Sequence, residues 1–153
     1  MHYFGEINNY EMILAPTGSI AQNIWYKIAQ QFPFVELDAI IIMPNHIHGI
    51  LHIDHDIHKT GDAINRVSIS TSNKCANPNV GGVTGCNNPM LYDNLSRVIR
   101  WYKGRVKYET TKRKLPFNWH SRFHDRILRI ETNELNIKRN YIHNNPKNWK
   151  YDM

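Results

Sequence analysis

The sequence is poor in cysteine and has no long hydrophobic run, and both absences exclude classes of protein. Two cysteines, Cys75 and Cys86, occur among the 153 residues, and two thiols make neither a disulfide scaffold nor a zinc framework. No uninterrupted apolar run approaches the roughly 18 residues of a membrane span. The first residues carry none of the basic and apolar segments of a secretory signal. We therefore expect a cytoplasmic protein without a membrane segment.

Acidic residues are scarce in the last part of the chain. Residues 1–90 hold 4 Lys/Arg and 7 Asp/Glu, a net charge of −3, whereas residues 91–153 hold 15 and 6, a net charge of +9. Aromatic residues such as Trp101, Tyr102 and Trp119 are interleaved with this basic charge. Cations neutralise phosphates and rings stack on bases, so the pattern is typical of single-stranded nucleic-acid binding. A solvated basic surface with its aromatic rings in the core explains the pattern equally well.

The length and composition indicate one globular domain, residues 1–153, of the α+β class. An apolar fraction of 41% with 21% charged residues is that of a folded protein. Residues 54–90 are rich in Ser, Thr, Asn and Gly without apolar periodicity, and we interpret them as a flexible surface insertion.

Apolar periodicity and turn residues predict the elements around this insertion. They are a hairpin of residues 2–7 and 10–15 around Asn8 and Asn9, a helix from Ser19 to about Gln31, strands over 34–43 and 46–53, a helix from Leu91 to the run "KRKLP", a strand over 119–130, and a helix to about Asn144. The order fits helices packed on one face of an antiparallel sheet. The polar face of the second long helix carries Arg97, Arg100 and Lys103, which we predict to contact DNA phosphates.

The stretch "IIMPNHIHGILHI", residues 41–53, contains three histidines within seven positions. Side chains two apart on a strand share a face, so His46, His48 and His52 lie on one side and the aliphatic residues mainly on the other. Two imidazoles on a rigid strand can bind one metal ion. Half-exposed strand histidines that bind nothing are the alternative, and so short a motif does not exclude it.

The last predicted helix carries "YIHNNP", in which Tyr141 and Asn145 are four residues apart and project from the same face. The amide oxygen of Asn145 could complete the coordination of an ion held by the strand histidines. The phenol of Tyr141 could serve as a nucleophile. The ordinary alternatives are a tyrosine that packs the helix onto the sheet and an asparagine that caps the helix before proline.

Two long stretches, "VELDAIIIMPNHIHGILHI" and "FNWHSRFHDRILRIETNELNIKRNYIHNNPKNW", carry a resemblance to a known family. Together with "FGEI" near the start and "LSRVIRWYKGRV", they resemble the REP-associated tyrosine transposases. These form a branch of the single-tyrosine HUH transposases, which act on single-stranded DNA. The resemblance covers nearly the whole chain except the insertion.

The resemblance implies a ferredoxin-like fold and a metal-dependent DNA strand transferase of the bacterial cytoplasm or nucleoid. His46 and His48, as the HUH motif, would bind Mg²⁺ or Mn²⁺, and Asn145 would complete the metal site. Tyr141 would form a 5′-phosphotyrosine link at hairpin-containing sites in single-stranded DNA. A monomer and a homodimer are both compatible with the resemblance.

Other parts of the chain resemble the family in detail or depart from it. The run "RFHDRI" resembles a basic run of the family, which implies phosphate contacts for Arg122 and Arg126. Family members usually have a further strand before "FGEI", so we expect the histidine sheet to lack one neighbouring strand. Two other functions stay open. One is a non-catalytic nucleic-acid-binding protein. The other is a zinc hydrolase built on the histidines, which is disfavoured because no glutamate base lies nearby.

Overall fold

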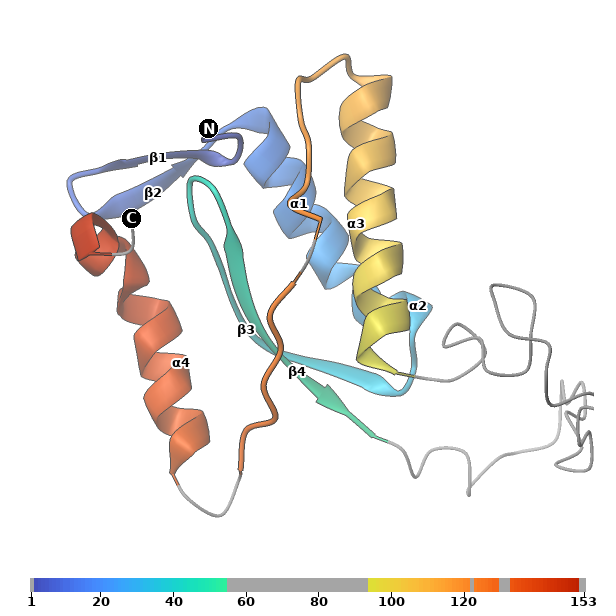
Figure 1. Ribbon diagram of the computed structural model, residues 1–153, viewed down its shortest axis with the longest axis vertical. Helices are drawn as coiled ribbons and strands as arrows, with labels where there is room; N and C mark the ends of the chain where they lie inside the picture. The colour runs from blue at the N-terminus through green and yellow to red at the C-terminus, as the bar shows by residue number, and fades with distance from the viewer. Residues whose placement is uncertain (1, 55–93, 122, 130–132, 152–153) are drawn as a thin grey trace, which may run out of the picture.

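The computed structural model describes residues 2–54, 94–121, 123–129 and 133–151, which form an α+β fold (Figure 1). The predicted insertion lies outside the described residues except for Asp54. The elements in chain order are β1 (Gly5–Asn8), β2 (Glu11–Leu14), α1 (Pro16–Tyr26), α2 (Ile28–Gln31), β3 (Val35–Ile42), β4 (Ile47–Ile53), α3 (Leu95–Lys112), α4 (Glu134–Asn144) and the 3₁₀ helix η4 (Asn145–Tyr151). Within these ranges, none of the helices combines the length and apolar character needed to cross a membrane.

The first hairpin is confirmed, with its turn one residue later than predicted. β1 and β2 pair antiparallel from Gly5 opposite Leu14 to Asn8 opposite Glu11. The two turn residues, Asn9 and Tyr10, have φ angles of 50° and 65°. Positive φ at both central residues is the condition for the hairpin turn whose twist matches that of the flanking strands.

The first helix begins at Pro16 rather than at Ser19. Proline is favoured in the first turn of a helix because its missing N–H would have no partner there. α1 buries its apolar face, which includes Ile20, Ile24 and Trp25. Lys27 separates α1 from α2, which ends at Gln31 as predicted.

The second hairpin, β3 with β4, carries the histidines and confirms the two predicted strands. Its register runs from Val35 opposite Ile53 to Ile42 opposite Ile47, with an irregularity between Leu37 and Ile40. In the described part of the chain this sheet has two strands and is separate from the β1–β2 sheet. The aliphatic face packs against the core, as the alternation predicts, through Leu37, Ile40, Ile47, Leu51 and Ile53.

α1 and α4 cover opposite faces of this hairpin (Figure 1). A Cβ atom on Gly49 would point into the Trp25 ring of α1, whereas the neighbouring His48 ring contacts the Tyr141 ring of α4. Successive residues of a strand point to opposite faces. The arrangement therefore differs from our expectation of helices on one face, and it leaves the histidines facing α4.

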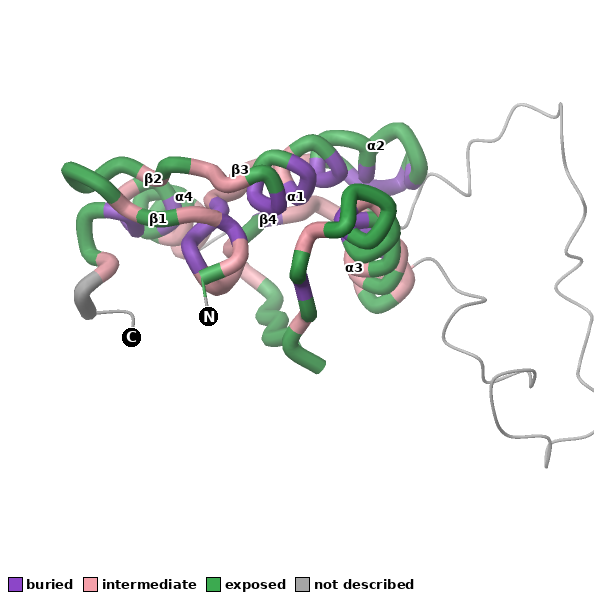
Figure 2. Tube along the Cα trace, turned by 90° about the horizontal axis from the view of Figure 1, so that it is seen from above, coloured by how far each residue is buried: buried purple, intermediate pink, exposed green. Residues whose placement is uncertain are grey.

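α3 packs beside α1 and completes the core on the aliphatic side. Its N-cap is Asn94, whose side-chain oxygen accepts a hydrogen bond from the backbone N–H of Arg97. The buried hydroxyl of Tyr102 donates to the carbonyl of Ala21 at 3.0 Å. Burial raises the pKa of this phenol, so it stays protonated. Figure 2 shows that buried positions recur along α1, whereas α4 is mostly intermediate or exposed.

The strand predicted over residues 119–130 is wrong for the residues that the structure describes. Residues 119–121 and 123–129 form neither strand nor helix, and Ile127 is 91% exposed. Lysines of α3 hold the start of this segment instead. Lys103 Nζ donates to the carbonyl of His120 at 2.7 Å, and Lys107 Nζ donates to the carbonyl of Phe117.

The final helix is confirmed as α4, which begins after Asn133 and ends at Asn144. Pro146 follows α4, and the backbone continues through it as η4. Proline can occupy the first turn of a 3₁₀ helix because its nitrogen needs no partner there. This continuation carries Trp149 back toward the histidine hairpin, where its ring lies 6.0 Å from the ring of His46.

Candidate metal site and nucleophile

The imidazoles of His46 and His48 meet at the turn end of the β3–β4 hairpin. Their Nε2 atoms lie 3.0 Å apart and their ring centroids 4.6 Å apart. Nδ1 of His46 lies 2.6 Å from the side-chain oxygen of Asn45. An amide oxygen only accepts hydrogen bonds, so Nδ1 carries the proton and Nε2 of His46 presents a lone pair. Nε2 of His48 is then the donor of the 3.0 Å contact. For this nitrogen to bind an ion, the proton of the His48 ring must lie on Nδ1 instead.

This geometry is compatible with two ligands of a single divalent ion. Two imidazole nitrogens, each about 2.1 Å from an ion and at right angles to one another, are about 3.0 Å apart. The hydrogen bond from His46 to Asn45 is also the kind of outer contact that orients a metal-binding imidazole. Among the described residues, no three His, Cys, Asp or Glu side chains come together as a metal site. The candidate donor set is instead two imidazoles and an amide.

α4 brings the phenol of Tyr141 to the same place. The ring of Tyr141 lies 5.7 Å from the ring of His48, with the two planes at 74°. Tyr141 is 41% exposed, so its ring is accessible to a large substrate. The ammonium group of Lys138, one turn earlier, lies 5.5 Å from the centre of the Tyr141 ring. At this distance the ammonium group interacts with the face of the ring as a cation–π pair.

Asn145, the third predicted ligand, is buried beyond the end of α4. It is 1% exposed, and among the described residues neither its amide oxygen nor its amide nitrogen has a hydrogen-bond partner. In sequence it lies midway between Tyr141, which contacts His48, and Trp149, which contacts His46. A buried amide without a partner is costly, and its oxygen is a donor that Mg²⁺ and Mn²⁺ accept. The residues present therefore fit a divalent ion.

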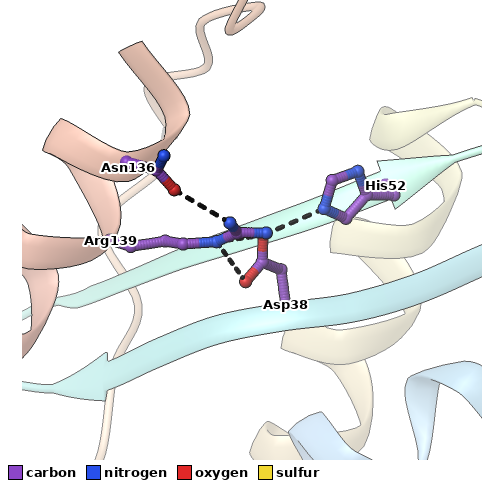
Figure 3. A network of polar contacts seen from close by, with 4 residues as sticks. All are labelled: Asp38, His52, Asn136 and Arg139. Atoms are coloured by element: carbon purple, nitrogen blue, oxygen red, sulfur yellow. Dashed lines mark hydrogen bonds and ion pairs between the residues drawn. The ribbon is translucent and has the colours of Figure 1, made fainter. Parts of the chain in front are cut away.

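A polar network beside the histidine pair was not predicted from the sequence (Figure 3). The carboxylate of Asp38 accepts hydrogen bonds from Nε and Nη2 of Arg139, at 2.8 to 3.0 Å, and one from Nε2 of His52 at 2.9 Å. The hydrogen bond from Arg139 is the main reason that the pKa of Asp38 is lowered, and burial opposes this shift. His52, the third histidine of the predicted strand face, thus has a partner in the protein.

The residues that we predicted to contact DNA phosphates are spread over the other parts of the molecule. The guanidinium of Arg97 lies 5.7 Å from the centre of the Phe32 ring, and Arg100 is exposed on α3. Lys103 is bound to the carbonyl of His120, and burial lowers its pKa. Two further predicted residues belong to the segment before α4. Arg126 forms an ion pair with Glu134 at 2.6 Å, and Arg122 lies outside the described residues.

Comparison with known proteins finds similarity to a bacterial protein. A protein of Haemophilus influenzae that is described as an uncharacterized protein is 29% identical over 151 residues, which cover 98% of this chain and 76% of that protein. No protein-family model matches the chain. No solved structure matches it either.

Proposed function

We propose that this protein is a metal-dependent transferase that cuts and rejoins single-stranded DNA through Tyr141. The proposal rests on the meeting of three side chains that the β3–β4 hairpin and α4 supply. Nε2 of His46 and Nε2 of His48 lie 3.0 Å apart, and the ring of Tyr141 lies 5.7 Å from that of His48. Phosphoryl transfer to a tyrosine needs a nucleophile next to a group that stabilises charge on phosphate.

A divalent ion, Mg²⁺ or Mn²⁺, would be held by His46, His48 and Asn145, and when bound it would polarise the scissile phosphate. The phenolic oxygen of Tyr141 attacks phosphorus, and the phenol proton leaves to solvent. The bond between phosphorus and the 3′ oxygen breaks, and that oxygen takes up a proton to become a free 3′-hydroxyl. The 5′-phosphotyrosine link conserves the energy of the phosphodiester bond, so the strands can be rejoined without ATP.

The proposed substrate is single-stranded DNA that contains a hairpin, in the cytoplasm or nucleoid of a bacterium. Two features support a nucleic-acid partner: the net charge of +9 over residues 91–153 and the exposed arginine on α3, Arg100. The resemblance to single-tyrosine transposases implies that the DNA substrate contains a hairpin and that the fold is ferredoxin-like. It is compatible with a monomer and with a homodimer.

The test is a covalent adduct between the protein and DNA. The protein is incubated with single-stranded hairpin DNA and Mn²⁺, and the products are separated on a denaturing gel. We expect a slower-migrating adduct that Tyr141→Phe abolishes. Tyr26→Phe, which alters a tyrosine that is 55% exposed on α1, should leave it unchanged. We expect His46→Ala to remove the response to Mn²⁺.

Three results would contradict the proposal in different ways. An adduct that survives in Tyr141→Phe would exclude this residue as the nucleophile. Salt-sensitive DNA binding with no adduct under any metal condition would indicate a non-catalytic nucleic-acid-binding protein. Tightly bound zinc that is unaffected by His46→Ala would remove the proposed metal site.

A further inference from the structure

The helix that carries Tyr141 has little apolar contact with the rest of the protein. In the described part of α4, Ile142 is the buried residue, and Ile137 is 59% exposed. α1, which covers the opposite face of the hairpin, buries residues in each of its turns. Because few buried apolar groups hold α4, polar contacts have a larger share in fixing its position.

Arg139 provides the strongest of these polar contacts, from the middle of α4 to β3. Its Nε lies 2.9 and 3.0 Å from the two oxygens of Asp38, and its Nη2 lies 2.8 Å from one of them. Nη1 donates to the side-chain oxygen of Asn136 at 3.1 Å, so three of the guanidinium nitrogens are engaged (Figure 3). A planar guanidinium that grips a carboxylate in this way fixes direction as well as distance.

The backbone of β3 is shaped to present Asp38 to α4. Leu37 pairs with Leu51 and Ile40 pairs with Gly49, so Asp38 and Ala39 together face a single residue of β4. An extra residue of this kind is a β-bulge, which redirects side chains and is common next to active sites. The bulge keeps Leu37 and Ile40 on the aliphatic face and leaves Asp38 on the histidine face.

His52 holds the same carboxylate from β4. Its Nε2 lies 2.9 Å from the Asp38 oxygen that Arg139 also binds. His52 is four residues after His48 on the same face of the strand. The carboxylate of Asp38 therefore joins the strand that carries the metal-binding pair to the helix that carries the phenol.

We propose that Asp38, Arg139 and His52 form a latch that sets the position of Tyr141 against His48. Arg139 is two residues before Tyr141 in α4, so the direction of its guanidinium fixes both the rotation and the height of the phenol. The three are positioning residues, since they act through the helix and touch no reacting atom. The effect of the latch on catalysis by Tyr141 rests on the proposed function, whereas its effect on the position of α4 does not.

The test separates these two consequences by measuring them independently in the full chain. Arg139→Met keeps much of the length of the side chain and removes the guanidinium group. Arg139→Lys keeps the positive charge but not the planar guanidinium. Arg105→Met is the matched control, because it removes the ion pair to Glu109 within α3. Hydrogen exchange reports the opening of α4 relative to α3. Single-turnover adduct formation and Mn²⁺ titration report the chemistry and the metal site.

We expect Arg139→Met to speed the exchange of α4 amides about tenfold or more while α3 is unchanged. A phenol displaced by about 1 Å should slow adduct formation on the order of 100-fold. Mn²⁺ affinity should also fall, because the proposed ligand Asn145 directly follows α4. Arg139→Lys should recover part of the rate, and Arg105→Met should change neither exchange nor rate. A variant that only weakened the fold would also speed the exchange of α3 amides.

Each contrary result has its own meaning. Unchanged exchange of α4 in Arg139→Met would overturn the latch. Faster exchange with an unchanged rate of adduct formation would overturn the positioning role. If the wild-type protein forms no adduct, but Arg139→Met still loosens α4 alone, the proposed function fails and the latch stands. If Arg139→Met does not fold, Asp38→Asn gives the same comparison from the other side of the contact.

Discussion

Replacing Gly49 by alanine should destabilise the protein, because the Trp25 ring of α1 lies directly against β4 at this residue. A Cβ atom there would lie 2.2 Å from Cη2 and 2.5 Å from Cζ2 of Trp25, whereas carbon atoms in favourable contact are about 3.5–4.0 Å apart. The indole is 4% exposed, and its ring lies 5.6 Å from the buried ring of Tyr102. The indole therefore cannot move aside without disturbing the core.

Overpacking of a core costs about 1–3 kcal/mol. We expect the upper end of this range, about 3 kcal/mol, because the nearest atoms belong to a rigid, buried ring. In a chain of this length, such a loss lowers Tm by roughly 6–12 °C.

The assay is thermal and urea unfolding followed by circular dichroism, with a second glycine as the control. At Gly104, on the exposed side of α3, an added Cβ would meet no atom within 4 Å. Alanine there should stabilise the protein by about 0.5–1 kcal/mol, because glycine loses more backbone entropy in a helix. The same substitution therefore has opposite signs at the two sites.

A smaller residue at position 25 should relieve the clash, so Trp25→Leu together with Gly49→Ala should be less destabilised than the sum of the two single variants. Unfolding of Gly49→Ala at the wild-type urea concentration would refute the reasoning. The close approach of α1 to β4 would then be wrong, and with it the placement of α1 opposite the histidines.

Two further predictions concern the histidine face. Asn45→Ala removes the hydrogen-bond acceptor that lies 2.6 Å from Nδ1 of His46. The variant should bind Mn²⁺ about 10–100-fold more weakly in a calorimetric titration. An unchanged affinity would contradict a role of Asn45 in orienting the His46 imidazole. The pKa of Asp38 is lowered mainly by Arg139. The carboxylate of Asp38 therefore stabilises the fold when the pH is above 3.8, the ordinary pKa of this group. This contribution is lost as the pH falls through the lower pKa of the folded state. Urea unfolding from about pH 5 to about pH 2 should therefore reveal a steeper loss in the wild type than in Asp38→Asn, and parallel curves would count against the ion pair.

Regular periods in the sequence predicted the parts of the fold that local geometry controls. The alternation around His46 and His48 correctly separated the histidine face from the aliphatic face, because a strand repeats every two residues. The spacing of Val98, Tyr102 and Val106 correctly marked the buried face of α3. Such patterns follow from the conformation of one segment and need no knowledge of its neighbours.

Features that depend on a distant partner could not be predicted in this way. Arg139 binds Asp38 across 101 positions of sequence, and a bulge reverses the alternation at Asp38. An imperfect alternation predicted a strand over residues 119–130, and the described residues of this range do not form one. A strand needs a neighbouring edge, and the carbonyls of Phe117 and His120 instead accept hydrogen bonds from lysines of α3.

The burial of Asn145 bears on the choice that the sequence left open between a helix cap and a metal ligand. The residue does occupy the C-cap of α4, but its side chain makes no capping hydrogen bond, and both amide atoms are unpaired within the described structure. Burying such a group without a partner costs about 1–3 kcal/mol, and an apolar side chain of similar size would avoid that cost. A capping asparagine whose side chain faced water or formed a hydrogen bond with the backbone would not have this cost. This cost is offset if the amide oxygen binds an ion together with the imidazoles of His46 and His48. The unpaired amide therefore supports the proposed metal site more strongly than either histidine does alone.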